Sequence, residues 1–219
     1  MTGPAPVVLA GRHVRLEPLT PAHAAGLAAA GAGNRSTFAL TTVPDDETSA
    51  AAYVAALLAD ADAGSALPFA TVLPDGEVVG ATRFLDLQYW PTGDGRGRDV
   101  PVVAEIGGTW LTPKVQRSAV NTEAKLLLLT HAFDTWRVRR VSLKTDARNA
   151  RSRAAIERLG ARFDGVLRAH MPAADGGLRD SAFYSVLDTE WPEVRAGLTS
   201  RLSRGGGADP GHRRDVTAS

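Results

Sequence analysis

The stretch from Val103 to Lys125 is the part of the sequence whose residue types and spacing point most clearly to chemistry. Its pattern predicts a strand over Val102–Leu111, then a short loop, then a helix over Thr122–Trp136. The first turn of a helix has backbone N–H groups without intrahelical acceptors, and the helix dipole makes that end positive. A pyrophosphate is a ligand that such a helix start can bind. We therefore expect a phosphate-containing ligand at this loop.

Charged and capping residues around this helix start allow two interpretations. Lys114, Arg117 and Lys125 add positive charge that would screen a bound phosphate. Alternatively, Asn121 caps the helix with Glu123 in its first turn, an arrangement that requires no ligand. The residues alone leave both interpretations open.

A second helix start follows at Asn149. This residue is a natural N-cap and places Ser152 at the third helical position, so the pair either only caps the helix or also faces a ligand. Three arginines flank the same turn: Arg148, Arg151 and Arg153. Each is either a phosphate ligand or a solvated charge on the helix surface.

Several common chemistries find no support in the sequence. It has no phosphate loop of the G-x-x-x-x-G-K-[ST] type, no H-E-x-x-H and no G-x-S-x-G. The five histidines share no metal-ligand spacing, so we expect no metal site. Because cysteine is absent, disulfides, thiolate ligands and a cysteine nucleophile are excluded.

Length and composition indicate one ordinary globular domain. The chain has 219 residues, of which 44% are hydrophobic and 22% charged. Residues 1–203 are expected to form that single domain and residues 204–219 a disordered tail, because the tail is rich in glycine and charge. No apolar stretch is long enough for a membrane span and no signal pattern is present, so we expect a cytoplasmic protein without a membrane partner.

The net charge of +1 is unevenly distributed. Residues 101–168 carry 13 Lys or Arg against 6 Asp or Glu, whereas residues 1–100 carry 6 against 11. A basic middle segment favours a polyanionic ligand, either a nucleic acid or a phosphorylated cofactor. We expect no nucleic-acid partner, because the arginines fall in a cofactor-like pattern without an aromatic platform.

Helices and strands alternate along the chain in an order that indicates a mixed α/β (α+β) fold. The predicted strands are Val14–Leu19, Leu67–Leu73, Glu77–Gln88, Val102–Leu111, Val138–Thr145, Ala161–Arg168 and Arg179–Leu187. The predicted helices are Pro21–Ala30, Thr48–Asp62, Thr122–Trp136, Asn149–Leu159 and Glu190–Leu202, and Pro91–Asp99 is expected to be a mobile loop. One parallel crossover is expected near the middle.

Several ordered motifs between residues 100 and 192 resemble the GNAT acyltransferases, in particular the RimJ/RimL-like branch of ribosomal-protein N-terminal acetyltransferases. The motifs are Glu105-Ile-Gly, Thr122-Glu-Ala, Asn149-x-x-Ser152-x-x-x-x-Glu157-x-x-Gly160 and, further on, Gly165-Val-Leu-Arg, Arg179-Asp, Tyr184-Ser and Glu190-Trp. The family's Q/R-x-x-G-x-G/A signature falls on 116–121, where Gln116 fits and Ala119 and Asn121 differ. A left-handed backbone at Ala119 would cost ~1 kcal/mol or more.

This resemblance implies the fold, the cofactor and the site residues. The fold would be a mostly antiparallel mixed sheet with a central splayed pair of parallel strands, a bulge at Gly107-Gly108 and helices on both faces. The cofactor would be acetyl-CoA (coenzyme A). Glu105 would be the general base, unless it is a structural carboxylate paired with an arginine, and Ser152 would assist the departing thiolate. The cofactor-binding residues would be Thr109, Leu111, Gln116, Arg117, Ser118, Ala119, Val120, Asn121, Thr122, Asn149, Ser152 and Arg153.

The expected reaction is transfer of the acetyl group to a primary amine. Neutralising a lysine ε-amine of pKa ~10.4 at pH 7.4 costs ~4 kcal/mol, whereas a peptide α-amine of pKa ~7.7–8.0 costs less than ~1 kcal/mol. A peptide or protein N-terminus is therefore the favoured acceptor. Two alternatives stay open, a small-molecule amine as acceptor and a non-catalytic acyl-CoA sensor, and a homodimer is possible.

Overall fold

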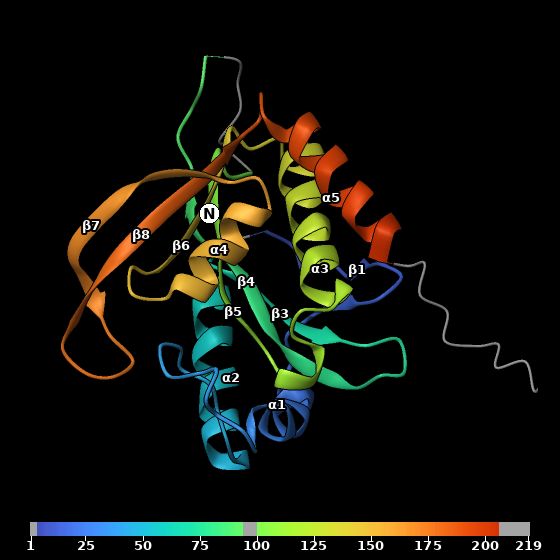
Figure 1. The fold of residues 1–219 in the computed structure, drawn as a ribbon, viewed down its shortest axis with the longest axis vertical. Coiled ribbons are helices and arrows are strands. Elements are labelled where there is room, and N and C mark those ends of the chain that lie inside the picture. Colours follow the sequence, from blue (N-terminus) through green and yellow to red (C-terminus); the bar gives the residue numbers. More distant parts are fainter. Residues whose placement is uncertain (1–3, 94–99, 206–219) are drawn as a thin grey trace, which may run out of the picture.

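The computed structural model of the protein describes residues 4–93 and 100–205. Its strands form one sheet in the order β1-β2-β3-β4-β5-β6-β8-β7, in which only β5 and β6 are parallel among the described residues (Figure 1). The strands are β1 (Leu9–Ala10), β2 (Arg15–Pro18), β3 (Leu67–Val72), β4 (Val78–Gln88), β5 (Val103–Leu111), β6 (Arg140–Asp146), β7 (Arg162–Pro172) and β8 (Leu178–Leu187). The predicted mixed, mostly antiparallel sheet is confirmed.

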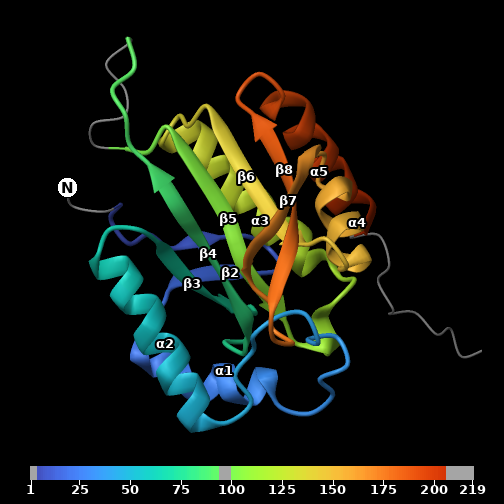
Figure 2. The ribbon, with the colours of Figure 1, turned by 90° about the vertical axis from the view of Figure 1, so that its left-hand side faces the viewer.

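Helices cover both faces of this sheet, as the two views in Figures 1 and 2 show. They are α1 (Ala24–Gly31), α2 (Glu47–Asp62), α3 (Ala119–Thr130), α4 (Ala150–Arg158) and α5 (Trp191–Gly205). Helices α1 and α2 enclose one apolar cluster with Trp110, and α3 and α5 enclose a larger one that includes Leu128 and Leu198. The sheet is therefore the middle of three layers.

The start of α3 differs from the sequence-based expectation. The helix begins at Ala119 instead of Thr122, because the Ser118 hydroxyl accepts a hydrogen bond from the Val120 N–H at 3.2 Å and caps the helix. Asn121 is consequently inside the first turn and is not the cap. The helix continues beyond Thr130 as one π-helical turn.

Three other elements, β1, β7 and α5, also differ from the sequence-based expectation. The two-residue strand β1 was not predicted, and β7 extends to Pro172, past a left-handed Ala169 with φ of 48°. Helix α5 includes Arg204 and Gly205, which were predicted to belong to the tail.

Two predictions concern residues that the structure does not describe. The rest of the predicted tail, residues 206–219, and most of the loop predicted to be mobile, residues 94–99, lie outside the described residues.

Candidate active site

The parallel strands β5 and β6 pair only at their beginnings. Three residue pairs are in register, from Val103 with Arg140 to Glu105 with Ser142, and no pairing follows although both strands continue. Glu105 therefore lies at the fork where the two strands separate. This fork is the predicted splay.

A β-bulge at Gly107 and Gly108 accompanies the separation. The four residues 107–110 of β5 lie opposite the three residues 81–83 of β4, and Gly108 has a left-handed φ of 58°. The extra residue reverses which faces the side chains occupy. Before the bulge Ile106 packs toward α3, whereas after it Trp110 packs on the opposite face, in the α1 and α2 cluster. The bulge predicted at these glycines is present.

Glu105 is a buried carboxylate, 4% exposed, and its partner is a lysine instead of an arginine. Lys144 of β6 donates to Glu105 Oε2 at 2.7 Å and to Asp86 Oδ2 at 2.8 Å. Burial raises the pKa of Glu105 to about 7, and the neighbouring ammonium of Lys144 opposes this rise. A carboxyl with such a pKa can exchange a proton near neutral pH.

A hollow of about 320 Å³ opens beside this carboxylate. Its lining combines polar and apolar side chains: Asp86, Leu87, Gln88, Val103, Ala104, Glu105, Ser142 and Phe183. The mixture of carboxylates, a hydroxyl and an aromatic ring suits a small polar group such as an amine.

The loop before α3 presents backbone donors. Within the described part of the chain, no acceptor is found for the N–H groups of Arg117, Ser118 and Ala119. Arg117 has the left-handed backbone, with φ of 62°, whereas Ala119 is helical. The strain expected at Ala119 therefore does not arise. These amides and the helix dipole form an anion-binding end of α3.

The remaining loop positions contribute differently. Asn121 and Thr122 are half-buried in the first turn, while the N–H of Val120 already binds the cap. The side chain of Leu111 is buried, and its carbonyl accepts from the Gln116 side chain at 2.8 Å. Thus Gln116 secures the end of β5.

Arg151 bridges the open end of the fork. Its guanidinium donates to Gln116 Oε1 at 3.3 Å and to the Thr37 carbonyl at 2.7 Å. Gln116 follows β5 and Arg151 follows β6, so this contact joins the segments beyond the two diverging strands. Through the Thr37 carbonyl, Arg151 also contacts the loop between α1 and α2.

Helix α4 begins as predicted from its cap. Asn149 Oδ1 accepts from the Ser152 N–H at 3.0 Å. The Ser152 hydroxyl has no hydrogen-bond partner among residues 4–93 and 100–205 and is half-buried. It is available to a ligand.

The arginines flanking this turn are already engaged. Arg153 donates to the Tyr184 hydroxyl at 2.9 Å and lies over the Phe163 ring. Arg148 pairs with Asp146 and Asp175. Arg153 as a cofactor ligand stays a prediction, and it requires this side chain to leave Tyr184.

Lys125 has a different environment from the predicted one. It is 4% exposed and donates to the hydroxyls of Thr82 at 3.2 Å and Thr109 at 2.5 Å, which lie 2.8 Å from each other. Burial lowers the pKa of this lysine to about 7. It does not screen a phosphate at the surface, and the Thr109 side chain points into the core. Lys125 lies four residues before the apolar Leu129, so both residues are on the same face of the helix. This spacing was the sequence signal that Lys125 is buried.

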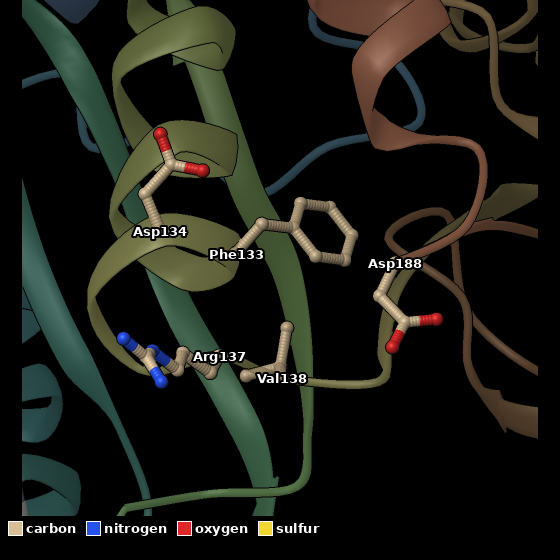
Figure 3. A pocket seen from close by; sticks show the side chains of 5 residues that line it. All are labelled: Phe133, Asp134, Arg137, Val138 and Asp188. Carbon is tan, nitrogen blue, oxygen red and sulfur yellow. The ribbon is translucent and has the colours of Figure 1, made fainter.

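A second hollow, of about 430 Å³, lies near the beginning of β6 (Figure 3). The charged side chains that line it, Asp134, Arg137 and Asp188, point in different directions in Figure 3. Asp134 accepts from Trp191 Nε1 at 2.8 Å, and Asp188 pairs with Arg139. Because its carboxylates are engaged and do not converge, this hollow is the weaker site despite its larger volume.

The described residues contain no group of three or more His, Asp or Glu side chains placed to hold a metal ion. None of their helices has the length and apolar character needed to cross a membrane.

Comparison with known proteins assigns the family. The model of the acetyltransferase (GNAT) domain matches residues 13–162. The chain therefore belongs to the GNAT acetyltransferases, a family whose members use acetyl-CoA. The expected family is confirmed.

Individual relatives have similar sequences or folds. A GCN5-related N-acetyltransferase from Brucella melitensis has a TM-score of 0.77 and 30% identity over 91% of this chain and 86% of its own. Mycobacterium smegmatis RimJ, solved with CoA-disulfide, has a TM-score of 0.71 and 24% identity over 90% and 93%, which supports the fold. The Bacillus subtilis protein named "Putative ribosomal N-acetyltransferase YdaF" is 33% identical over 88 residues, 40% of this chain and 47% of that protein. The match thus spans about half the length of this curated relative.

Proposed function

We propose that this chain transfers the acetyl group of acetyl-CoA to a primary amine, with the α-amine of a peptide or protein N-terminus as the preferred acceptor. The observation that carries the proposal is the buried carboxylate of Glu105 at the fork between β5 and β6, beside a hollow. Ribosomal proteins are the suggested class of protein acceptor, in line with the name of the Bacillus subtilis relative.

Proton transfer supports an α-amine. With a pKa of about 7, Glu105 is within about one unit of a peptide α-amine, so moving the proton costs ~1 kcal/mol. A lysine ε-amine is more than three units away, which corresponds to ~4–5 kcal/mol. Glu105 therefore receives the α-amine proton with little penalty.

The residues around the fork fit the cofactor, which supplies an acetyl thioester when bound. The N–H groups of Arg117, Ser118 and Ala119, which have no acceptor among the described residues, would hold its pyrophosphate. The backbone of β5 from Thr109 to Leu111 and the α4 turn at Asn149 would hold its pantetheine arm. The Ser152 hydroxyl would donate to the departing thiolate, because no partner in the described residues occupies it.

The test is release of free thiol from acetyl-CoA with three acceptors: a peptide with a free N-terminus, an N-terminally blocked lysine peptide and a small primary amine. We expect the free N-terminus to react fastest. Glu105→Gln and Ser152→Ala should each lower kcat by ~10²-fold or more. Glu193→Gln, an exposed change in α5, is the matched control.

Each alternative has its own result. A small amine that reacts faster than the peptides would make a metabolite or antibiotic the acceptor. Binding of acetyl-CoA without turnover of any amine would make the chain a sensor. Near-normal kcat in Glu105→Gln with a raised KM would reassign this residue to acceptor binding.

Three coarser points complete the proposal. We propose one acyltransferase domain that includes α5 to its end at Gly205. We also propose a cytoplasmic location and assembly as a homodimer. Light scattering at several protein concentrations measures the mass and decides the oligomeric state.

A further inference from the structure

Lys144 is shared between two carboxylates that differ in exposure. Its Nζ lies 2.7 Å from Glu105 Oε2 and 2.8 Å from Asp86 Oδ2. The side chains of Lys144 and Glu105 are 11% and 5% exposed, whereas that of Asp86 is 59% exposed. One partner of the ammonium is therefore buried and the other reaches solvent.

The backbone of β4 is shaped for this contact. Asp86 has a left-handed φ of 48° at an irregularity in the pairing of β4 with β5, between Leu85 and Gln88. Aspartate adopts this conformation more readily than most residues, and a bulge redirects a side chain. The Phe183 ring, 5.9 Å from Lys144 Nζ, adds a cation–π contact.

The contact of Lys144 with two carboxylates becomes important when Glu105 is protonated. Neutral Glu105 no longer balances the charge of Lys144, and a largely buried ammonium without a counter-charge is costly. Asp86 supplies that charge in both protonation states. The geometry thus lets Glu105 change its charge without leaving Lys144 unpaired.

We propose that Lys144 and Asp86 are positioning residues for Glu105, Lys144 by orienting its carboxylate and Asp86 by holding the ammonium while Glu105 is protonated. The inference rests on the proposed function. In the step, the N–H bond of the attacking amine breaks and an O–H bond forms on Glu105. Lys144 keeps its three protons and its bond to Asp86 throughout.

The neighbouring charges act in opposite directions on Glu105. Burial is the largest influence on its pKa and raises it, Lys144 lowers it, and Asp86 raises it. The charged or titratable groups near this cluster are Asp86 and Arg83 from β4, Lys144 from β6, His170 from β7 and Arg179 from β8. Arg83 is paired with Asp60, and burial, Lys144 and Arg179 lower the pKa of His170. Removing the charge of Asp86 should therefore lower the pKa of Glu105, and removing the charge of Lys144 should raise it.

The experiment is a ¹³C NMR titration of the Glu105 side-chain carboxyl in the full chain without substrate. The signal is assigned by its loss in Glu105→Gln. Asp86→Asn, which keeps a side chain that tolerates a left-handed backbone, should move the titration midpoint down by about one pH unit. Lys144→Met should move it up by about one pH unit or more. Asp188→Asn removes an ion pair elsewhere and should leave it unchanged.

A midpoint that does not move in Asp86→Asn, or that moves in the same direction in both variants, overturns the proposal. If Lys144→Met does not fold, the Asp86→Asn titration decides alone. The pH dependence of kcat/KM separates this inference from the proposed function. If the pH at which kcat/KM rises shifts together with the NMR midpoint of Glu105 in the variants, both the positioning roles and the role of Glu105 as the base are supported. If the NMR midpoint shifts and the pH dependence of kcat/KM does not, the positioning roles stand and Glu105 is not the base.

Discussion

Replacing Lys125 with methionine should make the protein more stable at neutral pH. The ammonium of Lys125 is buried under β4 and β5 and contacts two threonine hydroxyls and no carboxylate among the described residues. Methionine has a similar length and no charge to desolvate. Thr82 and Thr109 keep a hydrogen bond to each other at 2.8 Å after the change.

The size of the effect follows from the lowered pKa. In the unfolded chain Lys125 has its ordinary pKa of 10.5, whereas burial lowers the pKa in the folded protein to about 7. This difference corresponds to about 5 kcal/mol as an upper limit. Between pH 7 and 10.5 the unfolded state binds the extra proton, so the contribution of Lys125 to the free energy of unfolding rises with pH. Below pH 7 the contribution is constant.

Urea denaturation followed by tryptophan fluorescence measures this contribution. The free energy of unfolding of Lys125→Met minus that of the wild type should be about 3 kcal/mol larger at pH 7 than at pH 9.5. Lys114→Met, at an exposed lysine, measures the effect of the same substitution at the surface. A Lys125→Met difference that is the same at both pH values would refute the reasoning, because the buried lysine would then be protonated throughout.

Two further predictions concern the backbone. Ala119→Pro removes an N–H that has no acceptor in the described part of the chain, at the first position of α3, where proline is tolerated. It should weaken acetyl-CoA binding about tenfold by calorimetry. Glu47→Pro, at the first position of α2, is the control, and equal affinity of Ala119→Pro and wild type would exclude this amide from the site. Gly11→Ala places a Cβ 2.4 Å from a buried carboxylate of α3 and should lower the free energy of unfolding by ~1–3 kcal/mol in urea. The new Cβ of Gly197→Ala meets no atom of residues 4–93 and 100–205 within 4 Å, so this variant should be neutral or stabilising. Equal losses in the two variants would contradict the predicted clash.

Local patterns in the sequence predicted local structure well. Asn149 and Ser152 are three residues apart, and their cap depends only on that spacing. The bulge at Gly107 and Gly108 was expected from the family resemblance, and the left-handed backbone of Gly108 accompanies it. The family motifs placed Glu105 at the fork between the parallel strands.

Contacts between segments that are far apart in the sequence could not be predicted from it. Lys144 meets Glu105 across 39 positions and Asp86 across 58, and charged residue types alone do not select these pairs. The start of α3 was misplaced because both Ser118 and Asn121 are good caps. Local propensity does not decide between them, and tertiary packing of Val120 in the core favours the earlier start.

The buried carboxylate of Glu123 connects α3 to the beginning of the chain. It accepts backbone hydrogen bonds from Arg12 at 2.9 Å, His13 at 2.5 Å and Val14 at 3.0 Å, across 109 to 111 positions of sequence. Closing so long a loop has an entropic cost that must be met before the contact forms. These amides should therefore join α3 late in folding and exchange their hydrogens only when the whole domain opens. Although they lie near one end of the chain, residues 12–14 would then be among the slowest to exchange.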